Sequence, residues 1–327
     1  MDWKHQTVLV TGAGGFIGSH LTERLVSLGA KTRAFVRYNS VGSWGWLDQC
    51  PIKQDVEIYA GDIRDADSVR RAVAGADVVF HLAALIAIPY SYDSPISYLR
   101  TNAEGTLNVL QSVRESGASM MVHTSTSEVY GSARYVPMDE SHPLQAQSPY
   151  AASKTAADKL VESFHCSFGL PVTTLRPFNT YGPRQSARAV IPAIIIQALV
   201  GSRIQLGNLF PTRDFNYVAD TVEAFVLAAT SPNALGETIN VGTGTETSIE
   251  QIATNVMNII GRQLPVVADE QRLRPADSEV DRLCANSQKA RELLGWEPVE
   301  SQRQGLARTV EWIRENLQMY KIDRYAI

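Results

Sequence analysis

Hydrophobic and polar residues follow two patterns along the first half of the chain. Short apolar runs rich in β-branched residues alternate with longer stretches whose apolar residues recur at helical spacing. Several short runs are nearly all apolar, as expected of parallel strands covered by helices on both faces. The pattern predicts an α/β fold, a doubly wound parallel sheet built from βαβ units. Strands are expected over residues 7–11, 31–36, 56–59, 78–81, 120–125, 172–175 and 238–241, and helices over 18–28, 67–73, 103–116 and 149–168.

Beyond Arg176 the pattern changes. Glycines and prolines divide the chain into short segments, which predicts a smaller, irregular α+β domain. The strand over 238–241 is expected to return to the main sheet, so that the two domains are interleaved. We therefore expect one domain over residues 1–180, completed by a returning strand near 215–243, and a second domain over residues 181–327.

Composition narrows the class of protein. The chain has 327 residues, of which 44% are hydrophobic, enough for one large core or two domains. Its net charge of −4 gives no reason to expect nucleic acid or an anionic membrane as a partner. The three scattered cysteines form neither a disulfide framework nor a metal-ligand spacing. No signal-peptide-like segment follows Met1, and no apolar run has the length of a membrane span. We expect a cytoplasmic protein without a metal ion.

A glycine-rich segment lies between the first expected strand and the first expected helix. Gly12 permits a tight turn there, while Gly15 and Gly18 let the backbone approach a pyrophosphate and let the helix pack on the strand. The helix N-terminus offers free N–H groups to the anion. Because strand and helix both flank the segment, it favours a dinucleotide site over a merely structural glycine turn. The residues of this site are Gly12, Gly14, Gly15, Phe16, Ile17 and Gly18.

Two residues at strand ends are candidates for the adenosine half of a dinucleotide. An acidic residue at the end of the second strand would bind a free ribose 2′-hydroxyl, but this chain has Arg37 there. A cation at that position pairs with a 2′-phosphate, which favours NADP over NAD. Asp62, after the third strand, is placed to bind the adenine amino group. A solvated arginine and a plain turn aspartate are the alternative interpretations.

Candidate catalytic residues lie on and before the helix over 149–168. Tyr150 and Lys154 are one helical turn apart, so both side chains can project from one face. A nearby ammonium and a positively charged nicotinamide ring would lower the pKa of the phenol from about 10 toward neutrality. The pair is therefore a candidate for the proton transfer that accompanies hydride transfer. Upstream, Thr126-Ser127-Glu128 adds a carboxylate, which indicates a second acid–base step after the oxidation.

Together these residues resemble the extended short-chain dehydrogenase/reductase family, and within it the nucleotide-sugar epimerases and dehydratases. The resemblance covers essentially the whole chain. It implies a Rossmann-type fold, NAD(P) that is tightly bound and regenerated in each turnover, and a nucleotide-diphosphate sugar held by the second domain. Further cofactor contacts are implied at Ile63, Leu82, Ala83, Ala84 and Asn102, and substrate contacts at Asn179, Arg188, Arg213 and Arg274.

The resemblance also implies roles in catalysis. In this family the residue at Thr126 hydrogen-bonds the sugar O4, and Tyr150 removes the O4 proton while hydride leaves C4. In the 4,6-dehydratases the glutamate at position 128 takes the C5 proton, water leaves from C6, and hydride returns to C6. The deoxythymidine-diphosphate-glucose dehydratases carry an aspartate before this glutamate, where this chain has Ser127, as the GDP-mannose dehydratases do. Glu128, once protonated, is then the candidate proton donor to the C6 oxygen.

Several functions stay open at this point. Glu128 favours a dehydratase over a UDP-sugar 4-epimerase, which tends to lack an acid there, but UDP-glucuronate decarboxylases share the same triplet. The segments around Tyr150, Arg176 and Arg213 look most like the hexosamine 4,6-dehydratases of the legionaminic acid pathway. Those enzymes act on UDP- or GDP-linked N-acetylglucosamine. The non-enzyme alternative is a cofactor-binding regulatory protein, which the intact catalytic set disfavours.

Other features carry two interpretations each. Arg184 and Arg188 are equally compatible with a nucleotide contact and with solvated loop positions. For Arg213 and Arg274, ordinary surface arginines are the less favoured alternative to the substrate contacts. An aromatic loop over residues 38–46 either covers the adenosine end, packs on a partner subunit or is a hydrophobic anchor. The helices over 103–116 and 149–168 are expected to form the interface of a homodimer, as in relatives.

Overall fold

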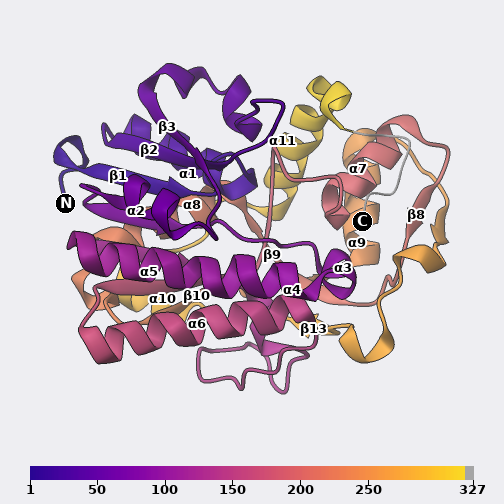
Figure 1. Ribbon diagram of the computed structural model, residues 1–327. Coiled ribbons are helices and arrows are strands. Elements are labelled where there is room, and N and C mark those ends of the chain that lie inside the picture. The colour runs from indigo at the N-terminus through magenta and orange to yellow at the C-terminus, as the bar shows by residue number, and fades with distance from the viewer. Residues whose placement is uncertain (321–327) are drawn as a thin grey trace.

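A parallel sheet with helices on both faces forms the centre of the molecule (Figure 1). The computed structural model describes residues 1–320, so residues 321–327 of the expected second domain lie outside the described part. The sheet has seven strands in the order β10-β6-β5-β4-β1-β2-β3, all parallel. This is the predicted Rossmann-type, doubly wound fold. Its strands are β1 (Thr7–Thr11), β2 (Lys31–Arg37), β3 (Val56–Gly61), β4 (Val78–His81), β5 (Met120–Thr124), β6 (Val172–Pro177) and β10 (Thr238–Val241).

The strand bounds follow the backbone pairing more closely than the apolar pattern. β1, β4 and β10 have the predicted bounds. β2, β3 and β6 run one or two residues further than predicted, because pairing continues beyond the apolar run. Arg37 is paired with Gly61 and Val241 with Pro177 in the register of the sheet.

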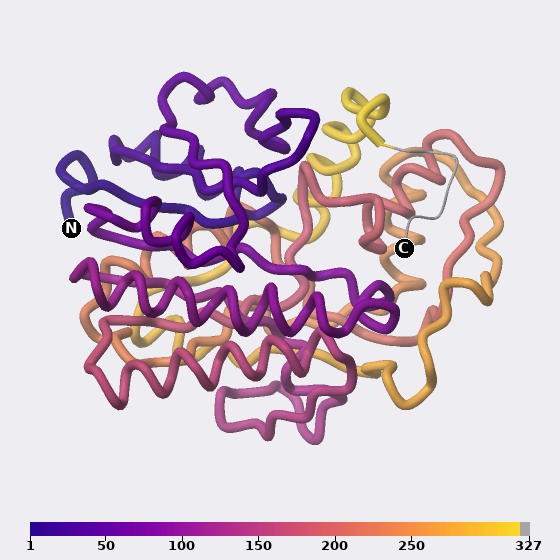
Figure 2. Tube along the Cα trace, viewed as in Figure 1, coloured from indigo at the N-terminus to yellow at the C-terminus, as the bar shows by residue number. Residues whose placement is uncertain are grey.

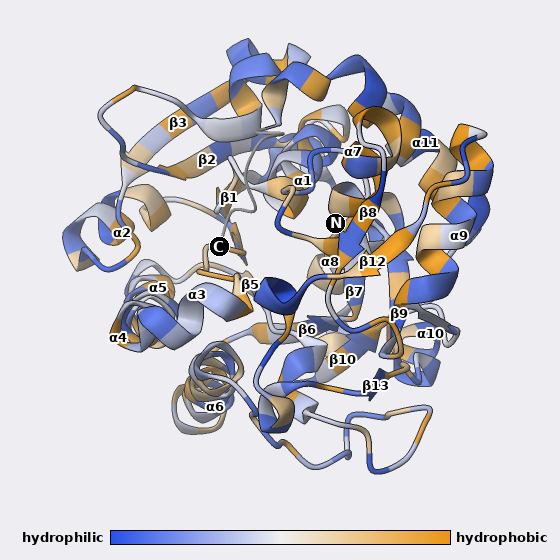
Figure 3. Ribbon diagram, turned by 90° about the vertical axis from the view of Figure 1, so that its right-hand side faces the viewer, coloured by the Kyte–Doolittle hydropathy of each residue, from blue (hydrophilic) through white to orange (hydrophobic). Residues whose placement is uncertain are grey.

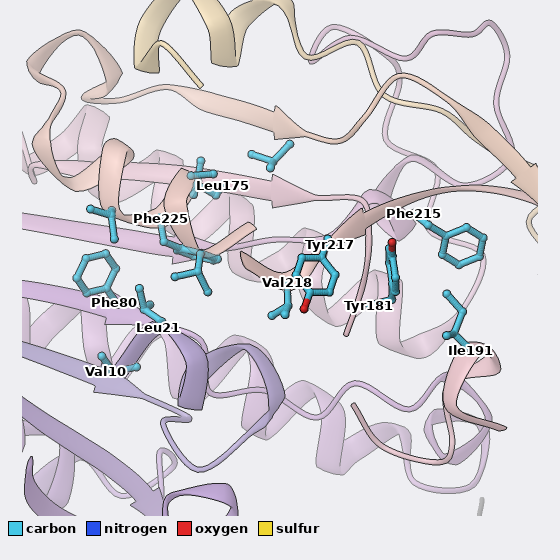
Figure 4. Packing of buried hydrophobic residues seen from close by; sticks show 14 of the residues in the cluster. Val10, Leu21, Phe80, Leu175, Tyr181, Ile191, Phe215, Tyr217, Val218 and Phe225 are labelled. Atoms are coloured by element: carbon cyan, nitrogen blue, oxygen red, sulfur yellow. The ribbon is translucent and has the colours of Figure 1, made fainter. Parts of the chain in front are cut away.

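Alternate residues of a strand face opposite helix layers. Val8 and Val10 of β1 pack in one buried cluster with the first layer, and Leu9 between them packs in a second cluster with the other layer. Figure 4 shows Val10 and Phe80 of the first cluster close to helix residues, and Figure 3 shows the layers from the end of the sheet. The first layer contains α1 (Phe16–Ser27) and α8 (Val218–Thr230); the second contains α2 (Ala66–Val73), α5 (Gly105–Ser116) and α6 (Pro149–Phe168).

The helix α5 begins later than predicted. Instead of starting at Ala103, it follows a π-helical turn, η4 (Leu99–Glu104). Within this turn the side chain of Asn102 binds the backbone N–H and C=O of Leu85 at 2.8 and 3.0 Å. It also donates to Ser153 Oγ of α6 at 2.9 Å. The turn therefore joins the loop after β4 to α6.

Past residue 180 the chain leaves the main sheet and returns to it. Helix α8 packs against β5 and β6 beside α1, and β10 pairs with β6, Thr238 opposite Thr174. The rest of this part forms a small sheet, β11-β9-β13 with β7 beside β9, and a separate pair, β12-β8. The bounds are β7 (Asn179–Tyr181), α7 (Val190–Val200), β8 (Ile204–Leu206), β9 (Thr212–Tyr217), β11 (Glu246–Ser248), α9 (Ile249–Ile260), β12 (Val266–Ala268), β13 (Arg282–Leu283), α10 (Gln288–Leu294) and α11 (Gln302–Glu315).

The order of the strands fixes where a ligand can bind. From β1 the chain continues to β2 and β3 on one side, and from β4 to β5 and β6 on the other. The loops that leave the carboxyl ends of β1 and β4 therefore diverge and leave a crevice at this switch point. The loop after β1 carries the glycine-rich segment, and the loop after β4 begins with Leu82. In residues 1–320 no helix is both long and apolar enough to cross a membrane.

Candidate active site

A large cavity lies along the carboxyl ends of the main sheet and extends to the second part of the chain. Its volume is about 1470 Å³, beyond the usual range of about 300–1,000 Å³ for a small-molecule site. One end is lined by the glycine-rich segment and the other by Arg274 and Glu279. The size and length suit two ligands placed end to end. Among the described residues no group of histidine, cysteine and acidic side chains is placed to hold a metal ion.

The glycine-rich segment has the geometry of an anion-binding turn. Gly12 has φ of +72°, and a Cβ there would lie 2.9 Å from the backbone nitrogen of Ala83. A Cβ on Gly18 would lie 2.2 Å from the carbonyl oxygen of Gly12, so α1 approaches the turn closely only because residue 18 is glycine. The N-cap of α1 is Gly15, whose lack of a side chain leaves the first helical N–H groups free for an anion.

Two residues that sequence reasoning missed hold the neighbouring loop in place. The Thr11 hydroxyl accepts hydrogen bonds from the backbone N–H groups of Leu82 and Ala83, both at 3.1 Å. It also bonds His81 Nδ1 at 2.8 Å, and His81 Nε2 bonds Thr106 of α5 at 2.9 Å. The signal in the sequence is a polar residue that ends each of two strands directly after three apolar residues. Of the predicted cofactor contacts, Leu82, Ala83 and Ala84 line the cavity.

The adenosine end of the cavity carries charges of both signs. Arg37, at the exposed end of β2, and Asp62, at the end of β3, both line it, as does Ile63. Asp62 binds the guanidinium of Arg64 at 2.6 Å, and this hydrogen bond is the main reason the pKa of Asp62 is lowered. Among residues 1–320, no ion pair involves Arg37. Arg37 therefore lies near a carboxylate that is already paired with Arg64.

The predicted catalytic side chains meet in the middle of the cavity. Ser148 caps α6 by accepting from Ala151 N at 3.1 Å, and Pro149 follows as the first helical residue, so Tyr150 lies in the first turn. Thr126 lies close to Tyr150 and acts on the phenol as a hydrogen-bond partner that lowers its pKa. Thr126 also caps the short turn η5 (Ser127–Tyr130) by accepting from Glu128 N at 3.3 Å. Thr126, Ser127, Glu128, Tyr150 and Lys154 all line the cavity.

Burial controls the protonation of this group. It raises the pKa of Tyr150, and the hydrogen bond with Thr126 offsets only part of that effect. The lowering of the pKa of Tyr150 that was expected from the Lys154 ammonium and a nicotinamide ring is therefore not found in this structure, where burial outweighs it. Burial lowers the pKa of Lys154 to about 8, and its ammonium donates to the carbonyl oxygen of Thr124. Lys154 is therefore still a cation at neutral pH, but its pKa is only slightly above that pH.

A buried charged network lies behind Lys154. Asp158 accepts hydrogen bonds from Ser125 at 2.6 Å, Arg176 at 2.9 Å and His123 at 3.2 Å. Burial alone would raise the pKa of Asp158, but the hydrogen bond of His123 and the charge of Arg176 hold it below its usual range. Asp158 is the carboxylate whose charge raises the pKa of Lys154. Sequence reasoning missed it, although it follows Lys154 by one helical turn.

The far end of the cavity is rich in arginine. Arg213 of β9 is 6% exposed and reaches Glu279 at 3.5 Å, and Arg274 reaches the same carboxylate at 3.7 Å. The charge of Glu128 acts on Arg213 and favours its protonated form, against the larger effect of burial. Asn179 also lines the cavity, and its buried side-chain oxygen lacks a hydrogen-bond partner within residues 1–320. An anionic group with donors and acceptors fits this end.

Three polar residues that were predicted to contact a ligand have a different position or different partners in the structure. Asn102 is absent from the described lining of the cavity, because its side chain is occupied by Leu85 and Ser153. Arg184 binds both carboxylate oxygens of Glu23 of α1, at 2.8 and 2.9 Å, and thus joins the two parts of the chain. Neither interpretation predicted for Arg184 anticipated this ion pair. Arg188 is exposed at the rim of the cavity.

Known proteins share this fold and sequence over nearly the whole chain. The family model described as GDP-mannose 4,6 dehydratase matches residues 9–309. This chain belongs to the GDP-mannose 4,6-dehydratase family. It is 35% identical to a UDP-glucose 4-epimerase of Mycolicibacterium smegmatis, over 95% of this chain and 99% of that protein. It is 33% identical to a dTDP-glucose 4,6-dehydratase of Streptomyces antibioticus, over 94% of this chain and 92% of that protein.

A solved structure of similar sequence shows the same architecture. The dTDP-glucose 4,6-dehydratase DesIV from Streptomyces venezuelae, with NAD and TYD bound, matches with a TM-score of 0.87 and 31% identity, covering 96% of this chain and 99% of that chain. The protein is therefore an enzyme of the nucleotide-sugar branch of the extended short-chain dehydrogenase/reductase family. The expected class, a lyase, is the class of the dehydratases it resembles.

The lowered pKa of Lys154 predicts a pH-dependent stability. Between pH 8 and the ordinary value of 10.5, the unfolded chain keeps a proton on this lysine that the folded protein has lost. The free energy of unfolding therefore increases as pH rises through this range, because the folded protein no longer has to bury the charge. We expect urea unfolding to show the wild type gaining about 1 kcal/mol relative to Lys154→Met between pH 7 and pH 9. A difference between the two proteins that stays constant with pH would contradict this.

Proposed function

We propose that this enzyme is a nucleotide-sugar 4,6-dehydratase whose substrate is UDP- or GDP-linked N-acetylglucosamine and whose product is the 4-keto-6-deoxy sugar. The observation that carries the proposal is the place of Glu128. Its carboxylate lines the cavity that Tyr150 and Lys154 also line, and it is half-buried beside the charge of Arg213. Removing and returning the proton of the O4 hydroxyl requires only the tyrosine. A carboxylate beside it supports a second proton transfer, at C5.

Tyr150 and Thr126 are the proposed contacts of the sugar O4. Thr126 lies beside Tyr150 in the cavity, so one sugar O4 hydroxyl can contact both side chains. Tyr150 would accept the O4 proton, and Lys154, held by the Thr124 carbonyl, would supply the positive charge that stabilises the phenolate. Asp158 keeps that charge on Lys154 at neutral pH.

Glu128 is the proposed base for the C5 proton and the acid for the leaving C6 hydroxyl. Its backbone N–H is fixed by the Thr126 cap, which sets the direction of the side chain from the short turn. Ser127, the preceding residue, is 2% exposed and has no acidic proton to give. One carboxylate would therefore take the proton from C5 and release it to the departing oxygen as water.

NAD(P) is the cofactor that the first part of the cavity fits. The free N–H groups of α1 would hold the pyrophosphate, and the segments after β2, β3 and β4 would hold the adenosine half. When bound, NAD(P) supplies the oxidation at C4 and the reduction at C6. Asn179, Arg188, Arg213 and Arg274 are the proposed contacts of the nucleotide diphosphate, because this end of the cavity is cationic and carries an unpaired amide oxygen.

A 4-epimerase is the second candidate, since a UDP-glucose 4-epimerase is among the relatives at 35% identity. Mass spectrometry of products distinguishes the candidates. Incubation with UDP- and GDP-N-acetylglucosamine is expected to lower the mass of one of them by the mass of one water. An unchanged mass with an altered NMR spectrum would show epimerisation instead. Loss of carbon dioxide from UDP-glucuronate would show decarboxylation, and no product from any of them would support a binding protein.

The proposed role of Glu128 predicts a specific defect in Glu128→Gln. In deuterated water, incorporation of deuterium at C5 should fall by about 100-fold, because the amide cannot take the proton. Glu279→Gln is the matched control, since Glu279 lines the same cavity but pairs with the two arginines. It should raise KM while leaving deuterium incorporation near the wild-type rate. Full incorporation in Glu128→Gln would remove Glu128 from the mechanism.

Arg37 is proposed to select for the 2′-phosphate of NADP. It lines the cavity without an ion pair in the described chain, so its charge is available to a ligand. In Arg37→Ala the ratio of NADP affinity to NAD affinity should fall about tenfold, as measured by titration calorimetry. Arg33→Ala, on the same strand, is the control, because Arg33 is paired with Glu57 at 3.0 Å. An unchanged ratio in Arg37→Ala would exclude this role.

We also propose a homodimer. Helices α5 and α6 pack side by side on one outer face of the molecule (Figure 1). Two such pairs would form a four-helix interface around a two-fold axis. Light scattering at micromolar concentration should then give twice the 35.9 kDa of one chain. A mass of a single chain would contradict the proposal.

A further inference from the structure

The loop after β2 lies directly on the glycine-rich segment. This loop, residues 39–49, is called the strap below. The backbone N–H of Trp46 donates to the carbonyl oxygen of Gly14 at 3.0 Å. A Cβ on Gly14 would lie 2.3 Å from the carbonyl oxygen of Trp44, and a Cβ on Gly45 would lie 2.3 Å from the carbonyl oxygen of Gly14. The two backbones can approach this closely only because each carries a glycine at the contact.

The strap is shaped by its own side chains. Asn39 binds both the backbone N–H and the C=O of Ser43, at 3.1 and 2.7 Å. Asp48 accepts from Trp44 N at 3.0 Å and from the Ser43 hydroxyl at 2.7 Å. These bonds fix the turn on both sides of Gly45. The loop therefore has a defined shape before any ligand binds.

The outer side of the strap is anchored on the C-terminal helix. The ring of Trp46 lies edge-on to Trp312 of α11, with centroids 5.3 Å apart, and 6.4 Å from Tyr320. The Tyr320 hydroxyl donates to the carbonyl oxygen of Gln185 at 3.1 Å, in the loop that lines the substrate end. Figure 2 shows the yellow C-terminal helix beside the dark N-terminal loops. The strap is thus held by residues from the opposite end of the chain.

The inner side of the strap faces the large cavity. Asn39, Ser43, Trp44, Gly45 and Trp46 line the large cavity together with residues 12, 14 and 15 of the glycine-rich segment. If the strap were only a hydrophobic anchor, packing of the Trp46 ring against α11 would be sufficient. Glycines at both Gly14 and Gly45 would then not be needed. The paired glycines instead bring the strap to the place where the pyrophosphate is expected.

We propose that the strap is a cofactor-retaining element that covers the pyrophosphate and adenosine half of NAD(P) and slows its release. The inference rests on the proposed function, because an enzyme that oxidises and then reduces the same sugar must keep its cofactor between the two steps. Gly45 and Trp46 are positioning residues: Gly45 sets the approach to Gly14, and Trp46 holds the strap on α11. A ligand beneath the strap leaves only when these contacts separate.

A pair of glycines in the same loop provides the test. Gly45 and Gly42 have nearly the same backbone conformation, with φ of +68° and +65°. A Cβ on Gly45 meets Gly14, whereas nothing lies within 4 Å of a Cβ on Gly42. Gly45→Ala and Gly42→Ala therefore carry similar backbone strain and differ in the contact. Release of bound NAD is measured by exchange with labelled NAD in the intact protein.

The expected result is release at least about tenfold faster in Gly45→Ala than in the wild type, with Gly42→Ala within about twofold of it. Equal rates of NAD release in all three proteins, or an equal acceleration in both variants, would contradict the proposed role of the strap. A wild type that binds neither NAD nor NADP would overturn the proposed function itself. If Gly45→Ala does not fold, Trp46→Ala is the variant to measure. It is expected to fold, because the Trp46 side chain is only half-buried. It should release NAD about fivefold faster, and an unchanged rate would refute the anchoring role.

Discussion

The site depends on how closely the backbone of the glycine-rich segment lies to its neighbours. Gly12 is in contact with the loop after β4, Gly18 brings α1 onto Gly12, and Gly14 meets the loop after β2. A side chain at any of these positions would push apart segments that come from different parts of the sheet. The free N–H groups of α1 point into the cavity only while all three contacts hold. Steric exclusion, more than attraction, therefore sets the shape of the anion-binding end.

A second constraint is electrostatic and lies on the other side of the catalytic helix. Asp158 and Arg176 are both almost fully buried and 2.9 Å apart, and His123 and Ser125 complete the hydrogen bonds of the carboxylate. Removing either partner would leave an unpaired charge in the interior. The Arg176 guanidinium also binds the hydroxyl of Tyr130 at 2.7 Å, at the end of the turn that carries Glu128. One ion pair thus links the environment of Lys154 to the position of Glu128.

Much of the fold could be predicted because, in β1, β4 and β10, the apolar run and the backbone pairing end at the same residues. Where pairing continues into Arg37 or Pro177, no local pattern shows it. In the site, the glycine segment and the Tyr150–Lys154 pair are local motifs and were found. The Arg213–Glu279 and Arg184–Glu23 pairs join residues more than sixty positions apart, so only the folded chain reveals them. Asn102 was assigned to the cofactor from the family resemblance, yet its side chain is hydrogen-bonded to Leu85 and Ser153.

The return of the chain to its first sheet has a consequence for synthesis on the ribosome. One face of β5 and β6 is covered by α8, and the edge of β6 by β10, and both elements are made only after β7, α7, β8 and β9. Until Val241 has emerged, Leu175 and Phe80 lack part of the cover that Figure 4 shows around them. The nascent chain therefore exposes an apolar face that a chaperone can bind, and no cut near residue 180 yields two fragments that each bury their own core.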